Sequence, residues 1–404
     1  MDLLSNNNNN KNSDDDNSRI DYGILLPVMI LALIGLYAIY VAASHDPKVS
    51  NPVTMMLSQI AWYVLGGIGI FIIMHFDAEQ LWRIAPYAYD VGIFLLVAVL
   101  FLYDRNMATQ TGAKSWFALG PLSFQPSELM KPAYALMLGR VVTKHNHQYL
   151  KHTIQSDVLL IEKMLGWTLP VAALMLLQKD FGTMLVFLAI FAGVMLVSGI
   201  DGRILLSIFG VVAALGIIAI VLVTTAGGRD ILSHIGFHAY QFQRVDSWLH
   251  PSQDTSNNSY QYWQNLKAIG SGKLFGRGFN HTSVYVPVRE SDMVFSVIGE
   301  TLGFVGSCFL LITYFYLISQ MVKVTLDTKN EFYAYVSTGI IMMILFHVFE
   351  NIGMSIGLLP MTGIPLPFIS QGGSALLGNM IGIGIIMSMR YHYKSYMFSS
   401  KNFN

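Results

Sequence analysis

Cysteine and charge are both scarce in this chain. Of its 404 residues one is cysteine, and 12% are charged, about half of the roughly 25% typical of a soluble domain. A single cysteine, Cys308, excludes an internal disulfide framework and a metal site built on cysteines. The formal net charge is zero, so nothing indicates a nucleic-acid partner. The eleven histidines form no HExxH or similar ligand spacing.

The start of the chain also lacks the pattern of a cleavable signal peptide, because no basic stretch precedes a short apolar core. Residues 1–19 are polar and low in complexity, and we expect them to form a disordered cytoplasmic tail. A second cytoplasmic tail is expected over residues 393–404.

Hydrophobic residues make up 53% of the chain and gather in long blocks. A run of about 20 apolar residues can span a bilayer. The sequence therefore predicts an all-α integral membrane protein with ten transmembrane helices in residues 20–392. The ten runs are 22–44, 56–76, 86–103, 126–142, 164–178, 181–199, 204–223, 293–320, 332–358 and 372–389. The fourth run is the most polar and the fifth is short, whereas the eighth and ninth are long enough to tilt.

Lysine and arginine indicate the orientation, because they are enriched in cytoplasmic loops. With the N-terminus inside, the short outer loops hold only Lys48, Arg105, Lys114 and Lys179, and most other basic residues lie inside. We therefore expect both termini to be cytoplasmic. The long segment 224–292, between the seventh and eighth helices, is expected on the outer face of the cytoplasmic membrane, and parts of it are amphipathic.

The first polar cluster is "GAKSWFALGPLSFQPSELMK", residues 112–131. Glu128 near a helix start suits the helix dipole, and Lys131 three residues later shares its face. Two interpretations stay open. The two charges neutralise each other, or they line a polar cavity together with Lys114 and Gln125.

The second cluster is "GSGKLFGRGF", residues 270–279. Glycines let backbone N–H groups approach an anion, so Gly270 and Gly272 are candidates for contacting a phosphate. The basic residues that would supply charge are Lys267, Lys273 and Arg277. The stretch does not match a P-loop, and the alternative is a flexible turn.

The third cluster is "VPVRESDMVFSVIGE", residues 286–300, at the outer start of the eighth run. Asp292 suits a helix cap. Glu300 lies eight residues later, about 12 Å deeper and about 80° around the helix, so both carboxylates can face one cavity. An ionised group in hydrocarbon needs a partner, and we expect Lys131 to pair with Glu300. Asp90 and Glu350 also fall in apolar runs, and for each a structural role competes with a functional one.

Five stretches in this order resemble the SEDS family (shape, elongation, division and sporulation), which contains RodA, FtsW and SpoVE. They are "GAKSWFALGPLSFQPSELMK", "QKDFGT" (178–183), "AIGSGKLFGRGF" (268–279), "ESDMVFSVIGETLGFVG" (290–306) and "NIGMSIGLLPMTGIPLPFISQGGSALL" (351–377). The resemblance covers residues 20–392. Stretches such as "FQRVDSWLHP" are more similar to RodA than to FtsW, and a SpoVE-like role stays open.

The resemblance implies a ten-helix peptidoglycan glycosyltransferase that polymerises lipid II on the outer membrane face, together with a class B penicillin-binding protein. The family's essential aspartate maps onto Asp292, its Gln-Pro-Ser-Glu motif onto residues 125–128, and its helix-eight glutamate onto Glu300. The candidate substrate-binding positions are Lys114, Trp116, Gln125, Ser127, Glu128, Lys131, Lys267, Gly270, Gly272, Lys273, Arg277, Glu300, Ser370, Gly372, Gly373 and Ser374. Gln371 departs from the family's usual tyrosine, and Glu350 occupies a position that is often uncharged.

The reaction implied is an inverting displacement in which a sugar 4-hydroxyl attacks the anomeric carbon of the donor and undecaprenyl pyrophosphate leaves. Asp292 is expected to act as the general base. The leaving anion needs nearby cations, and a divalent ion such as Mg²⁺ or Mn²⁺ is a further candidate. Two alternatives remain from the residues, a flippase for a lipid-linked precursor and a non-catalytic scaffold.

Overall fold

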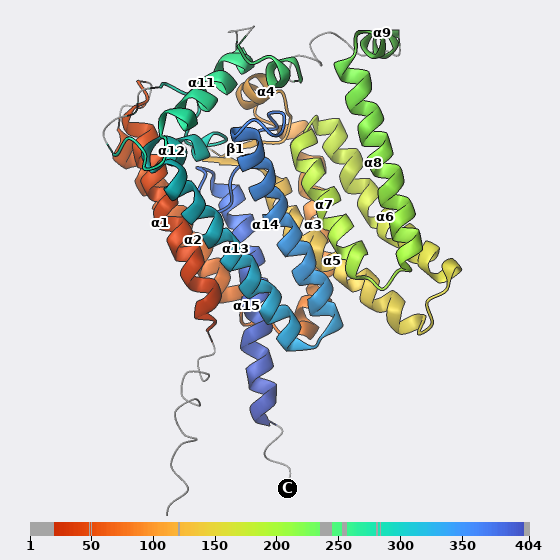
Figure 1. Ribbon diagram of the computed structural model, residues 1–404. Coiled ribbons are helices and arrows are strands. Elements are labelled where there is room, and N and C mark those ends of the chain that lie inside the picture. The colour runs from red at the N-terminus through yellow and green to blue at the C-terminus, as the bar shows by residue number, and fades with distance from the viewer. Residues whose placement is uncertain are drawn as a thin grey trace, which may run out of the picture.

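The computed structural model describes residues 20–47, 49, 51–119, 122–234, 245–252, 257–279, 282 and 284–399. The tail predicted over residues 1–19 lies outside this range, as do residues 400–404. The described chain is nearly all helical (Figure 1). Its one hairpin pairs β1 (Phe117–Leu119) antiparallel to β2 (Leu122–Phe124).

Each of the ten predicted runs lies on a helix, and the eighth lies on two consecutive ones. These helices are α1 (Tyr22–Ser44), α2 (Pro52–Ile73), α3 (Ala78–Leu102), α5 (Pro126–Gln148), α6 (Ile154–Gln178), α7 (Phe181–Val197), α8 (Gly202–Thr224), α12 (Val294–Thr301) with α13 (Gly303–Thr328), α14 (Glu331–Ser355) and α15 (Gly373–Ser399). Eight of the described helices are long and apolar enough to cross a membrane, and α5, α7 and α12 are not among them.

Short polar side chains explain where many of these helices begin. Asp21, Asn51 and Asp201 each accept a backbone N–H at the start of α1, α2 and α8. Asp77 and Gln80 form a capping box on α3. The last helix is longer than predicted, because α15 continues to Ser399 and so includes residues 393–399 of the expected tail.

The polar helix α5 lies inside the bundle, in contact with α3, α7, α14 and α15. Most of its side chains are buried, among them Glu128 and Lys131. A helix surrounded by protein needs no apolar surface for lipid, which explains why the fourth predicted run is the most polar. At the opposite extreme, α8 has no buried residue at all.

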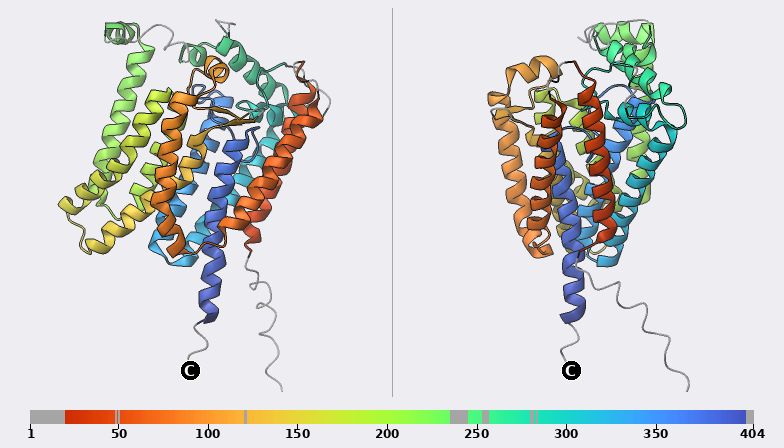
Figure 2. Two further views of the ribbon diagram at one scale, coloured as in Figure 1. Left: turned by 180° about the vertical axis from the view of Figure 1, so that it is seen from behind. Right: turned by 90° about the vertical axis from the view of Figure 1, so that its left-hand side faces the viewer.

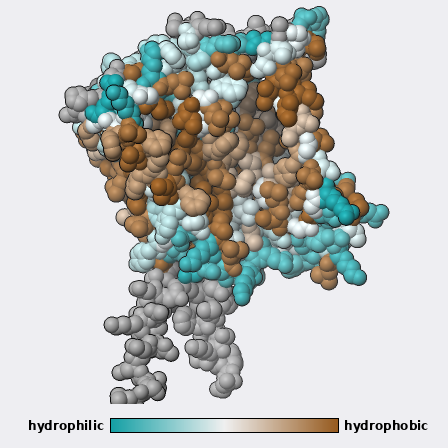
Figure 3. All heavy atoms as spheres, viewed as in Figure 1, coloured by the Kyte–Doolittle hydropathy of each residue, from teal (hydrophilic) through white to brown (hydrophobic). Residues whose placement is uncertain are grey.

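The short helices gather at one end of the bundle (Figures 1 and 2). They are α4 (Arg105–Thr111), α9 (Ala226–His234), a short helical stretch at residues 245–249 and α11 (Asn257–Ser271). The start of α1 and the end of α15 lie at the other end. We call the end with α11 the outer end. Figure 3 shows a broad hydrophobic band between two hydrophilic ends, as expected of a membrane-spanning bundle.

Candidate functional site

Asp292 lies in a tight turn at the outer end, just before α12. Its carboxylate is half-buried, and the Ser291 hydroxyl donates a hydrogen bond to its Oδ1 at 2.7 Å. On the other side stands Gly363, where an added Cβ would lie 3.2 Å from Asp292 Oδ2. The turn therefore presents one carboxylate between a serine and a glycine of a distant segment.

Three backbone carbonyls of the turn are each held by residues far away in sequence. Ser370 Oγ donates to Ser291 O at 2.7 Å, and the Gln371 N–H donates to Glu290 O at 2.9 Å. Asn351 Nδ2 donates to Asp292 O at 2.8 Å. The loop before α15 and helix α14 thus fix the turn from two sides. Asn351 was not among the predicted site residues, although it opens one of the quoted motifs.

Two residues beside this turn adopt the left-handed backbone region, which is unfavourable for bulky side chains. Val288 has φ of 51° and Phe368 has φ of 62°. Two hydrogen bonds hold the backbone at Phe368 in this conformation. Tyr63 donates to Phe368 O and Tyr314 donates to Pro367 O, each at 2.5 Å. Such strain persists only where the surroundings enforce it, and it clusters at functional sites.

Burial raises the pKa of Asp292 to about 6, and the nearby Glu290 carboxylate adds to this, whereas the hydrogen bond from Ser291 opposes it. The carboxylate is then ionised at neutral pH and is more basic than an exposed aspartate. Both properties suit a general base.

We expect any activity that uses Asp292 as a base to fall as the pH drops through about 6, because the carboxyl then becomes protonated. The rate should decrease about tenfold per pH unit on the acid side. Replacing Ser291 by alanine removes the bond that favours the ionised form, so the acid limb should move to higher pH. A pH–rate profile of both proteins measures this. A limb that stays in place in the Ser291→Ala protein would contradict the assignment.

Glu300 pairs with Arg289, so the predicted partner Lys131 is wrong. Arg289 NH2 lies 2.5 Å from Glu300 Oε2, and both side chains are buried. The same guanidinium donates to Ser296 O at 2.8 Å and to Ser296 Oγ at 3.0 Å. The chain folds back before α12, and this brings the Arg289 side chain within reach of Glu300 on the second turn of α12. Glu300 therefore anchors the turn that carries Asp292.

Lys131 is satisfied within another buried cluster. Its Nζ lies 2.8 and 2.9 Å from the two carboxylate oxygens of Glu128, and 2.9 Å from His347 Nε2. His347 Nδ1 contacts Met343 O at 2.6 Å, which assigns the proton to Nδ1 and leaves Nε2 to accept from the lysine. Of the two interpretations offered for Glu128 and Lys131, mutual neutralisation is confirmed.

Comparisons with known proteins identify the family. A family profile for FtsW, RodA and SpoVE, described as cell cycle protein, matches residues 22–395. The chain belongs to the SEDS family. It is 32% identical to the peptidoglycan glycosyltransferase MrdB of Escherichia coli K12 over 91% of this chain and 94% of that one. It is 28% identical to stage V sporulation protein E of Bacillus subtilis, over 91% and 96%.

Solved SEDS structures share the fold. One chain of a peptidoglycan synthase complex, described as coordinating polymerization and crosslinking, superposes with a TM-score of 0.72 at 27% identity, over 93% of this chain and 98% of that one. The rod shape determining protein RodA of Thermus thermophilus gives a TM-score of 0.64 at 27% identity, over 92% and 96%.

The SEDS motifs "QPSE" and "QKDFGT" meet at the outer end. Gln125 Nε2 donates to Asp180 Oδ2 at 2.8 Å, and the Lys114 N–H donates to Gln178 O at 2.8 Å. The Lys114 side chain is exposed, with its ammonium 5.2 Å from the centre of the Tyr103 ring. The Trp116 carbonyl accepts from Asp104 N–H at 2.8 Å, which holds the chain before the hairpin.

Two predicted SEDS serines carry hydroxyls without a protein partner. Ser127 is the second residue of α5 and Ser374 is the second residue of α15, and among the described residues neither buried Oγ has a hydrogen-bond partner. The two helices pack together. Their close approach needs Gly378, where a Cβ would lie 2.4 Å from Glu128 O. Unsatisfied hydroxyls at this end are available to a polar ligand.

Gln371, which departs from the usual SEDS tyrosine just before α15, still makes its backbone contact. Gln371 uses its N–H to hold the Asp292 turn, a contact that a tyrosine would make equally well. Gly373 is required for packing, because a Cβ there would lie 2.1 Å from the Trp62 ring, whereas a Cβ at Gly372 would make an ordinary contact with Ala375 at 3.8 Å. Glu350 is buried on α14, next to Asn351.

The stretch "GSGKLFGRGF" (residues 270–279), called the glycine loop below, forms hydrogen bonds to both α12 and α13. Its Lys273 and Leu274 carbonyls accept from the N–H groups of Phe304 and Val305 at 2.9 and 3.0 Å, which caps the start of α13. In return, the loop N–H groups of Arg277 and Gly278 donate to the carbonyls of Glu300 and Thr301 at 2.9 and 3.1 Å, at the end of α12. The glycine loop thus provides hydrogen-bond partners for the carbonyls at the end of α12 and for the N–H groups at the start of α13.

The expectation that Gly270 and Gly272 offer free N–H groups to a phosphate is wrong. Gly270 lies in the last turn of α11, and the Gly272 N–H donates to Ile269 O at 3.2 Å. Gly272 is needed because a Cβ there would lie 1.9 Å from Gly299 O.

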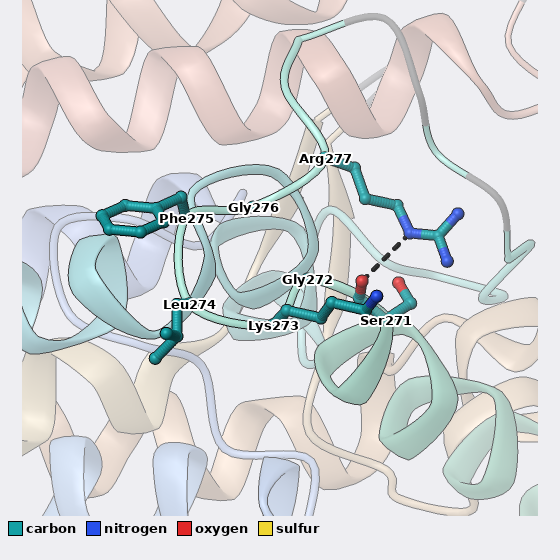
Figure 4. A pocket seen from close by; sticks show the side chains of 7 residues that line it. All are labelled: Ser271, Gly272, Lys273, Leu274, Phe275, Gly276 and Arg277. Carbon is teal, nitrogen blue, oxygen red and sulfur yellow. Dashed lines mark hydrogen bonds between the residues drawn. The ribbon is translucent and has the colours of Figure 1, made fainter.

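The basic side chains of the glycine loop remain exposed. Lys273 and Arg277 extend to one side of a shallow pocket, and Leu274 and Phe275 to the other (Figure 4).

Replacing Gly272 by alanine should destabilise the protein by about 1–3 kcal/mol, because the added methyl group overlaps the α12 backbone. Gly270→Ala is the matched control two residues away, where the Cβ meets nothing within 4 Å, and it should change stability by less than about 0.5 kcal/mol. Thermal unfolding in detergent compares the two. Equal stability of both variants would show that the loop does not pack as described.

Proposed function

We propose that this chain is a peptidoglycan glycosyltransferase that polymerises lipid II into glycan strands on the outer face of the cytoplasmic membrane. The single observation that carries the proposal is the Asp292 turn: one half-buried, basic carboxylate, braced from α14 and from the loop before α15, in a chain of the SEDS family. The curated relative MrdB, at 32% identity, bears the same activity in its name.

In the proposed mechanism Asp292 accepts the proton of the acceptor sugar's 4-hydroxyl as that oxygen bonds to the anomeric carbon of the donor. The bond from this carbon to the pyrophosphate oxygen breaks, and undecaprenyl pyrophosphate leaves as an anion. One base suffices for such an inverting displacement. The unpartnered hydroxyls of Ser127 and Ser374 are candidates for sugar contacts.

The charge that develops on the pyrophosphate calls for cations. Lys114 and the exposed Lys273 and Arg277 are available at the outer end, whereas Lys131 and Arg289 are committed to buried carboxylates. The ammonium of Lys267 lies 5.1 Å from the centre of the Trp263 ring. Within the described ranges no group of three or more histidine, cysteine or acidic side chains could hold a metal ion.

We propose ten membrane spans, with α5 and α7 crossing the bilayer and with α12 and α13 together forming the eighth span. The surrounding helices shield α5 from lipid, so its polar sequence does not prevent it from crossing. The start of α1 and the end of α15 lie on one side (Figure 1), and the positive-inside pattern assigns that side to the cytoplasm. Segment 224–292 and Asp292 then face outward.

A class B penicillin-binding protein is the proposed partner, because one chain similar in fold belongs to a synthase complex that coordinates polymerization with crosslinking. A role in elongation and cell shape is favoured over division or sporulation, since MrdB and RodA are among the relatives. The relatives also include FtsW and SpoVE proteins.

Purified protein in lipid vesicles with labelled lipid II tests the proposal. A glycosyltransferase produces gel-resolved glycan strands. A flippase moves label across the bilayer without polymer, and a scaffold does neither when it is alone. Transfer of lipid across the bilayer without any polymer, in the presence of the transpeptidase partner, would refute glycosyl transfer.

A further inference from the structure

Asp90 lies at the middle of α3, twelve residues from Ala78 and twelve from Leu102, and its side chain is exposed. At 1.5 Å per residue it is about 18 Å from either helix end. Helix α3 has the length and hydropathy of a membrane span. Asp90 thus places a carboxylate on the outside of the bundle at the depth of the lipid tails.

In the part of the chain that the structure describes, no cation is placed to neutralise that carboxylate. Among the described residues none forms a hydrogen bond or an ion pair with Asp90. On α5, the main neighbour of α3, Lys131 pairs with Glu128 and Arg140 donates to Trp82 O. Helix α2, which precedes α3 in the chain, contains no lysine or arginine, and Arg83, on the first turns of α3, contacts Glu79. In α6 the only lysine is Lys163, which contacts His145 at 3.1 Å near the inner end. A charge in hydrocarbon is costly unless it is paired, so a cation from outside the chain would stabilise Asp90.

The residues around Asp90 show what kind of partner fits. Tyr87, Asp90, Phe94, Val97 and Phe101 follow one another at spacings of three, four, three and four, and all five are exposed. Such a spacing forms the seam along which one helix packs against another, and a single polar residue within it sets the register of the pair. We call these five residues the outward seam.

The outward seam is free in the folded chain. Helix α3 packs on α5 and α6 through its opposite face, which includes Leu81, Ala85 and Leu96. Seen from behind, α3 runs along the front of the bundle with no element over it (Figure 2, left). The exposed fractions of Tyr87, Phe94 and Phe101 are 71%, 69% and 80%.

We propose that the outward seam docks a membrane-spanning helix of a partner protein that presents a lysine or arginine near the middle of the bilayer, opposite Asp90. The basic residue neutralises the carboxylate, and the aromatic positions pack against the partner on both sides of it. A second copy of this chain fits less well, because a twofold contact would bring two Asp90 carboxylates together. The inference rests on α3 spanning the membrane and is independent of glycosyl transfer.

The test uses the full chain in lipid vesicles and a synthetic helical peptide of about 20 leucines and alanines with one central lysine. Energy transfer between labels on chain and peptide measures binding. The lysine peptide should bind about tenfold more tightly than the same peptide with a central leucine. Asp90→Leu should remove this difference and leave lipid II polymerisation unchanged.

A relocated carboxylate is the matched control. Phe315 lies at the middle of α13 and is 75% exposed. The double variant Asp90→Leu, Phe315→Asp has the same charge at the middle of another exposed helix, outside the outward seam, and it should bind the lysine peptide more weakly than the wild type.

Three results would overturn the proposal. The wild type could bind both peptides equally, or the relocated carboxylate could bind the lysine peptide as well as Asp90 does. The wild type could also form a dimer without peptide that Asp90→Leu dissociates, which would make a second copy the occupant.

Discussion

Replacing Asp292 by asparagine is expected to abolish lipid II polymerisation. Asparagine keeps the size of the side chain and an oxygen to accept the Ser291 hydroxyl, but it cannot take up the proton of the attacking hydroxyl. A positioned general base contributes about 10²–10⁴-fold to a rate, so polymer formation should fall at least about 100-fold. Gel-resolved glycan strands from the purified proteins measure the effect.

The folded protein should survive this change. The raised pKa means that the folded state disfavours the ionised Asp292 at neutral pH, so removing the charge should leave thermal stability equal or higher. Glu290→Gln is the matched control in the same turn, since Glu290 contributes its carbonyl to the contact with Gln371. It should retain most activity. Near-normal polymer from Asp292→Asn would refute the assignment of the base.

Breaking the pair between Arg289 and Glu300 should have the largest effect on stability. Both side chains are buried, and a single replacement such as Glu300→Gln leaves a guanidinium without its counter-charge. The expected cost is about 3–5 kcal/mol, and activity should fall with it because the Asp292 turn loses its anchor. Replacing both residues, as Arg289→Met with Glu300→Leu, should cost less than the sum of the single changes.

A double-mutant cycle on thermal unfolding in detergent measures this coupling, which should exceed about 0.5 kcal/mol. Lys131→Met combined with Glu300→Leu is the control cycle. Those two residues belong to separate clusters, so their effects should add. Additive effects in the Arg289 cycle, or coupling in the Lys131 cycle, would contradict the observed pairing.

The helices could be predicted from the sequence, because their signals are local. A run of about 20 apolar residues indicates a helix of membrane length. The role of Asp292 as general base stays a prediction that rests on the resemblance of its motif to the SEDS family. Even the need for a partner to Glu300 follows from burial alone. The identity of that partner does not, because Lys131 and Arg289 carry the same charge and only the folded chain shows which one is adjacent.

The glycine loop shows a second limit of sequence interpretation. A glycine lets the backbone approach a phosphate, but it also lets one backbone segment approach another. The sequence alone does not show which of the two a glycine serves. At Gly272 the second use applies, since the carbonyl of Gly299 occupies the space of a side chain. Asn351 was missed for a related reason. An amide that donates to the carbonyls of Asp292 and Ile364 has no distinctive neighbours along the chain.

The reciprocal bonding between the glycine loop and the interruption of the eighth span has a mechanical consequence. A broken helix usually serves as a hinge, but here four backbone hydrogen bonds tie the loop to both halves, and the break becomes a rigid joint. A displacement of α11 would therefore be transmitted to α12 and, through Glu300 and Arg289, to the Asp292 turn. A partner bound to α11 at the outer surface would then change the position of the proposed base.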